Sequence, residues 1–176
     1  MSNNVLASEM GGEIFFKYKD LLIQKMLEDE ELTRVLMVGT KFPFLDTPKE
    51  DQEIGDLIGE QIFPVKYTPE TPQEQKQTYI TMDVSLVRGR TPQEVVAMVT
   101  LYVFAHKDLT MIYNKEGRMV ARVDYLISRL YDIFDGEMSF GNSKLMFIET
   151  QPFFVQRDIV GTSITFAGTD FARQYN

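Results

Sequence analysis

The hydrophobic period of this chain changes along its length, and that change constrains the fold more than any other feature. Residues 79–87, YITMDVSLV, alternate apolar and polar side chains, which predicts a half-buried strand. Residues 118–134, RMVARVDYLISRLYDIF, place apolar side chains three or four positions apart, which predicts an amphipathic helix. Gly136 follows where a helix commonly ends on a left-handed residue. A chain with both periods has to pack a helix stripe against a sheet face.

The segment between these two, TPQEVVAMVTLYVFAHKD, fits two structures. Thr91 to Glu94 has the form of a helix capping box with proline at the first helical position. The density of valine, threonine and aromatic residues over 95–104 instead favours a strand buried on both faces. We favour a strand over 95–106, paired antiparallel with 79–87, and keep the helix as the alternative.

The remaining elements complete an α+β domain. Residues 13–27 have helical spacing, a short helix continues after the acidic run 28–31, and 144–150 and 158–168 read as strands. The expected order is α-loop-β-β-α-β-β, an antiparallel sheet of about four strands with the helices packed on one face. Residues 1–12 are predicted to form a flexible N-terminal arm. Residues 13–176 would form a single domain with a loop-rich segment at 39–77, holding one short helix, and a loop at 110–119.

Composition narrows the classes of function. Against 18 Lys and Arg stand 26 Asp and Glu, a formal charge of −8, which argues against wide contacts with nucleic-acid phosphates or an anionic membrane surface. Cysteine is absent, so disulfides, thiolate metal sites and cysteine nucleophiles are excluded. The N-terminal residues show no signal-peptide pattern, and no apolar run reaches the ~20 residues that span a bilayer.

His106, the only histidine, would be the natural candidate for acid–base chemistry. It stands at the end of an expected strand, before Lys107 and Asp108, and no nucleophile-elbow, phosphate-loop or metal-ligand motif accompanies it. We therefore interpret His106 as a structural or solvated residue. The sequence predicts no catalytic, cofactor-binding or metal-ligating residue, and no enzyme activity.

Five arginines are the remaining candidates for a site. Arg118, Arg122 and Arg129 would share roughly one flank of the expected helix, with Arg88 and Arg90 in the preceding turn. The plain interpretation is a solvated surface with local ion pairs. The functional interpretation is a subunit interface with an acidic neighbour, which in a chain of charge −8 could be another copy of itself.

With this order of elements, the chain resembles the tail-terminator and tail-completion family of long-tailed bacteriophages. The resemblance rests on the stretches TYITMDVSL, VTLYVFAHKDL, GRMVARVDYLISRLYDIFDG and FVQRDIVGTSITFAGTDF, and covers about residues 60–171. It implies a structural subunit of the virion tail or neck, made in the host cytoplasm. The subunit would form a hexameric ring that caps the tail tube protein and meets the head connector or head-completion protein. It implies no cofactor, no membrane partner and no sequence-specific binding of nucleic acid.

The long N-terminal region departs from the shorter family pattern and leaves three further hypotheses. The chain could be another neck component, such as a head-completion protein or connector subunit. It could also belong to another class, as a small-molecule-binding domain or an enzyme with a closed apolar pocket near His106. A cellular adaptor that docks partners through the helical N-terminal region is the remaining alternative.

Overall fold

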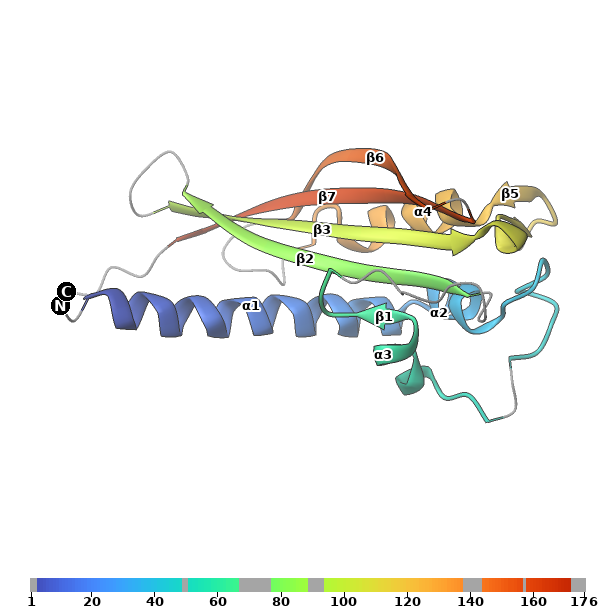
Figure 1. Cartoon of the computed structure of the whole chain (residues 1–176), viewed down its shortest axis with the longest axis horizontal. Helices are drawn as coiled ribbons and strands as arrows, with labels where there is room; N and C mark the ends of the chain where they lie inside the picture. Colours follow the sequence, from blue (N-terminus) through green and yellow to red (C-terminus); the bar gives the residue numbers. More distant parts are fainter. Residues whose placement is uncertain are drawn as a thin grey trace.

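The fold, taken from a computed structural model, centres on a five-stranded mixed sheet in the order β1-β2-β3-β7-β6 (Figure 1). The structure describes residues 3–48, 51–66, 77–88, 94–137, 144–156 and 158–171. The strands are β1 (Ile62–Phe63), β2 (Thr78–Arg88), β3 (Glu94–His106), β6 (Met146–Gln156) and β7 (Ile159–Phe171). A separate two-stranded sheet consists of β4 (Met111–Tyr113) and β5 (Met119–Ala121).

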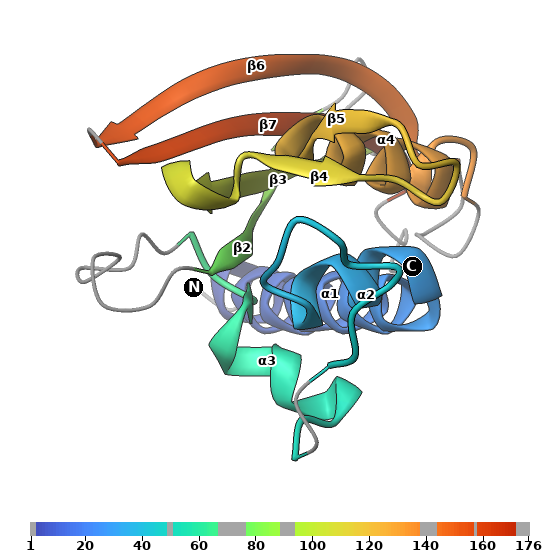
Figure 2. The same cartoon turned by 90° about the vertical axis from the view of Figure 1, so that its right-hand side faces the viewer.

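The helices gather on one face of the large sheet, which curves over them (Figure 2). They are α1 (Asn3–Glu28), α2 (Glu30–Met37), α3 (Leu57–Glu60) and α4 (Arg122–Phe134), with short 3-10 turns η1 (Ile54–Asp56) and η2 (Lys107–Leu109). The α+β class predicted from the sequence is therefore confirmed. The expected four antiparallel strands are present as β2, β3, β7 and β6, and the short strand β1 adds a parallel partner to β2.

One core joins this sheet face to α1, α2 and α4. The alternating residues Ile80, Met82 and Val84 of β2 lie in it, opposite Leu22 and Met26 of α1. The apolar stripe of α4 closes the same core with Val123, Leu126, Leu130 and Phe134. The period-2 and period-3.6 patterns of the sequence thus meet where the fold class requires.

A smaller aromatic cluster covers one end of the opposite sheet face. Tyr79, Phe104 and Ile159 are buried there, and Phe153 packs against them. This second cluster explains why β3 reads as an almost continuous apolar run, because at this end both its faces are covered. β3 pairs antiparallel with β2 along its length, so the strand interpretation of 95–106 was right and the helix alternative was wrong.

Three expectations are corrected. The helix predicted at 118–134 begins only at Arg122, because Met119–Ala121 pair with Met111–Tyr113 as a hairpin where a loop was expected. The short turn of that hairpin is held by the Asn114 side chain, which accepts from the backbone N–H groups of Glu116 and Arg118. The arm expected at 1–12 is helical from Asn3 onward, as the first part of α1.

Candidate functional site

The guanidinium of Arg122 lies fully buried at the first position of α4. Its Nε donates to the carbonyl of Leu109 (2.9 Å) and its Nη1 to the carbonyl of Val35 (2.8 Å). Nη1 also lies 3.3 Å from the carbonyl of Val38, and Nη2 donates to the carbonyl of Thr40. One side chain therefore joins four backbone oxygens that come from two distant parts of the chain.

The end of α2 explains why a cation is tolerated there. The last carbonyls of a helix have no intrahelical partner and carry the negative end of the helix dipole. Arg122 supplies that partner to Val35, within the last turn of α2. Burial lowers the pKa of Arg122 to about 10, so it stays charged at neutral pH while donating to these oxygens.

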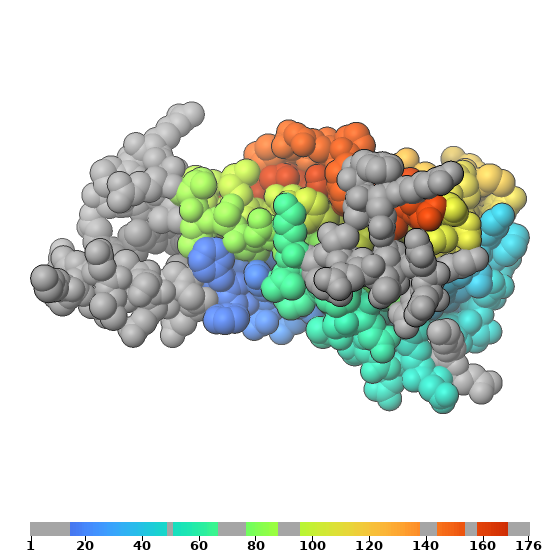
Figure 3. All heavy atoms as spheres, viewed as in Figure 1, coloured from blue at the N-terminus to red at the C-terminus, as the bar shows by residue number. Residues whose placement is uncertain are grey.

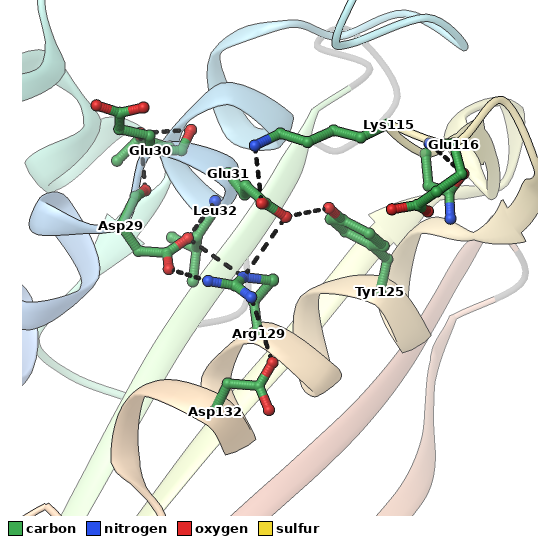
Figure 4. Close-up of polar contacts among 11 residues, drawn as sticks. Asp29, Glu30, Glu31, Leu32, Lys115, Glu116, Tyr125, Arg129 and Asp132 are labelled. Carbon is green, nitrogen blue, oxygen red and sulfur yellow. Dashed lines mark hydrogen bonds and ion pairs between the residues drawn. The ribbon is translucent and has the colours of Figure 1, made fainter.

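A second polar cluster surrounds Arg129, two turns further along α4 (Figure 4). Its guanidinium forms an ion pair with Asp29, contacts Asp132 at 3.2 Å (Nη1 to Oδ2), and lies 3.8 Å from Glu31 (Nε to Oε2). Asp29 is also the N-cap of α2, since its Oδ1 accepts from the backbone N–H of Leu32 at 2.8 Å. The short helix expected after the acidic run 28–31 is thus α2, which begins within that run, and two acids of the run, Asp29 and Glu31, contact Arg129 of α4.

Glu31 connects this cluster to the β4–β5 hairpin. Its Oε1 accepts from Lys115 Nζ at 2.8 Å, and its Oε2 accepts from the Tyr125 hydroxyl. These hydrogen bonds from Lys115 and Tyr125 hold the pKa of Glu31 below its usual value. Burial, together with the hydrogen bond to Glu31, raises the pKa of Tyr125, and the hydrogen bond to Asp29 raises the pKa of Arg129. All these shifts follow from packing α2 against α4 and the hairpin.

A hollow of about 480 Å³ opens beside this cluster. Its lining residues belong to the loop 40–46 and the β4–β5 hairpin, which lie at the end of the molecule that faces the viewer in Figure 2. Phe42, Phe44 and Leu45 form one wall. Tyr113 and the hairpin turn with Asn114, Lys115 and Gly117 form the other. The rings of Phe42 and Tyr113 stack at 5.0 Å, and Lys115 Nζ lies 5.8 Å from the ring centre of Phe44.

The loop that carries the phenylalanines is held by hydrogen bonds from two arginine side chains to its backbone carbonyls. Arg34 donates to the carbonyls of Pro43 (2.8 Å) and Asp46 (2.6 Å), and Arg122 donates to that of Thr40. The Tyr113 N–H also donates to the carbonyl of Lys41 at 2.8 Å. The wall of the hollow is therefore fixed by its backbone, while Leu45 remains 81% exposed.

His106 ends β3 and is almost fully buried. Its Nδ1 accepts from the backbone N–H of Asp108 at 3.2 Å, so the imidazole caps the short turn η2. This geometry agrees with the structural interpretation of His106. The hollow at the hairpin does not include His106 among its lining residues.

Of the five predicted interface arginines, Arg118, Arg122 and Arg129 have described side chains, and the structure does not bring these three together. Arg118 lies in the hairpin turn before α4 with its side chain 77% exposed, while Arg122 is buried and Arg129 is 26% exposed and ion-paired. The single exposed helix flank expected for these three is therefore wrong, and Arg122 presents no surface to a neighbouring subunit in this structure. Arg88 ends β2, and Arg90 lies outside the described residues.

Comparison with known families gives one match. Residues 29–167 match the sequence model of the YomW family, which covers more than half of the chain. The chain belongs to the YomW family. YomW is a phage-associated family, so the phage relationship expected from the sequence is supported at that level. No curated protein matched the chain.

The YomW match begins at Asp29, the N-cap of α2, and ends in β7. It therefore includes both arginine sites, the hairpin and the hollow, and leaves the whole of α1 outside. Within the residues that the structure describes, no three His, Cys, Asp or Glu side chains gather where they could hold a metal ion. None of the described helices is long and apolar enough to cross a membrane.

Proposed function

We propose that this YomW-family chain is a structural subunit of a phage virion that forms a ring at the head-proximal end of the tail, where it closes the tail tube and meets the head connector. The observation that carries the proposal is the match to a phage-associated family across the α+β domain. The resemblance of residues 60–171 to tail-terminator and tail-completion proteins points to the neck among the parts of a virion.

The surface of the domain agrees with an assembly role. Large apolar side chains are exposed at several places, among them the loop 40–46 and the start of β6. Exposed apolar clusters on a folded domain commonly mark contacts with other proteins. The polar clusters around Arg122 and Arg129 are used inside the chain, where they fix α2, α4 and the hairpin to one another.

The position of α1 keeps a related role open. The helix spans Asn3–Glu28 and stands before the YomW match. A head-completion protein or connector subunit would use such an additional element for a different neighbour. The same family match supports this alternative, and binding partners decide between the two.

The test is the mass and shape of the purified chain. Light scattering across a concentration series should give a closed oligomer near six subunits, and negative-stain electron microscopy should show rings. Co-purification should then recover the tail tube protein with a terminator and the connector with a head-completion protein. A chain that stays monomeric and captures neither partner contradicts the proposal.

A further inference from the structure

The two outer edges of the five-stranded sheet differ in how much of their backbone is already hydrogen-bonded. At one edge, β1 pairs with β2 at Ile80 and Thr81, and Asp83–Arg88 have no strand partner on that side within the described residues. At the other edge, β6 pairs with β7 and forms the upper rim of the molecule (Figure 3). Free N–H and C=O groups on an outer strand can pair with a strand of another molecule.

The beginning of β6 is closed by the part of the chain that leaves α4. The N–H of Leu145 donates to the carbonyl of Glu137 at 2.9 Å, and the carbonyl of Leu145 accepts from the N–H of Gly136 at 2.7 Å. Further along, the carboxylate of Asp135 takes the place of a backbone carbonyl, because its Oδ1 accepts from the N–H of Phe147 at 2.9 Å. The segment after α4 therefore occupies the position where a strand of another molecule would begin to pair with β6.

The rest of β6 is irregular in ways that oppose strand addition. Its register with β7 shifts between Phe147 and Glu149, and again between Phe154 and Gln156. Pro152 lies between these two shifts, and its ring nitrogen carries no hydrogen that could bond to a neighbouring strand. Bulges and prolines are two of the devices that keep outer strands from pairing with other molecules. On this side, β6 therefore offers no long regular run of donors to a partner strand.

Closing one of the two edges is enough to prevent open-ended growth. A contact between β6 of one copy and the unpaired part of β2 of the next would join two different surfaces. Head-to-tail contacts of this kind repeat without limit unless the rotation between copies closes them into a ring. With β6 closed, each copy has one strand edge left, so pairing between sheets stops at two copies.

We propose that Asp135 and Pro152 act as an edge lock, which keeps copies of this chain from joining β6 to β2 in an extended sheet. The edge lock leaves the side chains of β6 available for contacts while its backbone stays closed. This inference does not depend on the proposed ring, because it concerns a contact that the chain avoids in any state of assembly.

Amide hydrogen exchange tests the cap on Phe147 directly. Asp135→Ala removes the acceptor, so the Phe147 N–H should exchange about tenfold faster or more than in the unmodified chain. Asp135→Asn keeps an acceptor oxygen without the charge, and the Phe147 N–H should exchange within about threefold of its rate in the unmodified chain. Equally fast exchange in both variants would show that the charge, and not the hydrogen bond, protects this group, and would overturn the cap.

Self-association tests whether the edge lock controls assembly. The double variant Asp135→Ala/Pro152→Thr gives β6 two free donors, so light scattering across a concentration series should show species that grow beyond the mass of the unmodified chain. The matched control Asp132→Ala/Gln151→Thr changes the same elements without freeing an N–H group, and should keep the mass of the unmodified chain. Circular dichroism and urea denaturation establish that each variant is folded.

A third substitution identifies the second edge. The N–H of Ile80 donates to the carbonyl of Gln61 on the β1 side, and alternate residues of a strand point their N–H groups the same way, so the N–H of Leu86 also points away from β3. Leu86→Pro removes this donor from the unpaired part of β2. Added to the double variant, it should reverse the growth.

The outcomes bear on the edge lock alone. A folded double variant with the mass of the unmodified chain overturns the proposal, and so does equal growth of the matched control. Growth that Leu86→Pro leaves unchanged in a folded chain overturns the assignment of β2 as the second edge. The proposed ring is tested separately, on the mass of the unmodified chain.

Discussion

Arg122 and Arg129 are the same residue type on the same helix, seven positions apart, but they bind different partners. Arg122 is fully buried and donates only to backbone carbonyls, whereas Arg129 is partly exposed and pairs with carboxylates. Within the described part of the chain, the hydrogen-bond partners of Arg122 are all backbone carbonyls. Its charge is therefore balanced by the oxygens at the end of α2 and in the loop 38–40. The comparison shows that the environment, and not the residue type, decides whether an arginine fixes a backbone or forms a surface ion pair.

The largest expected effect is at Arg122. Arg122→Met keeps much of the apolar stem but removes the donors to four carbonyls, so the free energy of unfolding should fall by about 3–5 kcal/mol, the usual cost of breaking a buried polar network. Urea denaturation measures it. The free energy of unfolding of Arg122→Lys should lie between those of the unmodified chain and Arg122→Met, because an ammonium group cannot reproduce the planar fork of the guanidinium. A loss below about 1 kcal/mol for the methionine variant would mean that water takes over the hydrogen bonds of the guanidinium. It would contradict the conclusion that Arg122 holds these four carbonyls together.

Arg129→Met should cost less, about 1 kcal/mol, because its ion pairs are partly screened by solvent. The same denaturation measurement gives the value, and 1 M salt should shrink the difference between the variant and the unmodified chain for Arg129 but not for Arg122. If both methionine variants lost the same free energy of unfolding, or depended equally on salt, the distinction between a buried and a partly exposed arginine would be wrong.

Tyr125→Phe tests the link between the Arg129 cluster and the hairpin. The variant loses one hydrogen bond to Glu31 while keeping the ring that packs edge-to-face on Phe44 at 5.9 Å. We expect a loss of about 0.5–1 kcal/mol, the usual net value of one hydrogen bond. The titration of Glu31, followed by NMR, should move back toward its ordinary pKa, and an unchanged titration would exclude the hydroxyl as a cause of the shift.

The smallest effect concerns acid. The pKa of Glu31 is lowered in the folded chain, so its stabilising contribution is present above the ordinary value of 4.5 and is lost as the pH falls through the lower, folded value. Glu31→Gln should therefore flatten the pH dependence of stability in that window, while Asp132→Asn, exposed and with one ion pair, serves as the control. A slope in Glu31→Gln equal to that of the unmodified chain would show that other carboxylates set the acid limit.

Much of the fold followed from local pattern. The alternation of 79–87 became β2, and the apolar run 95–106 became β3. The strands predicted at 144–150 and 158–168 overlap β6 and β7, which begin slightly later and extend further, to Gln156 and Phe171. Gly136 has φ of 82° just after the C-cap of α4, as the sequence indicated. These features were readable because hydrophobic period and turn chemistry are set by residues close together in the chain.

The candidate sites could not be predicted from local sequence patterns in the same way. The hairpin β4–β5 has only three residues per strand, too few for alternation to show, and it moved the start of α4 from 118 to 122. The one available signal was Asp29, an N-cap residue type that stands directly before the acidic first turn of α2, Glu30 and Glu31. Nothing local marked Leu45 as a residue that lines a hollow, or Arg34 as the side chain that holds the loop 40–46.

The sequence by itself determined the α+β class, the main strands and the apolar stripe of α4, because each rests on the period of neighbouring side chains. Only the tertiary structure decided what the arginines do. Arg122 reaches the carbonyl of Val35 across 87 positions, and Arg129 reaches Asp29 across 100. A charged side chain carries no local mark of its partner, so its burial, its ion pairs and the surfaces left for a neighbour appear only when distant elements pack together.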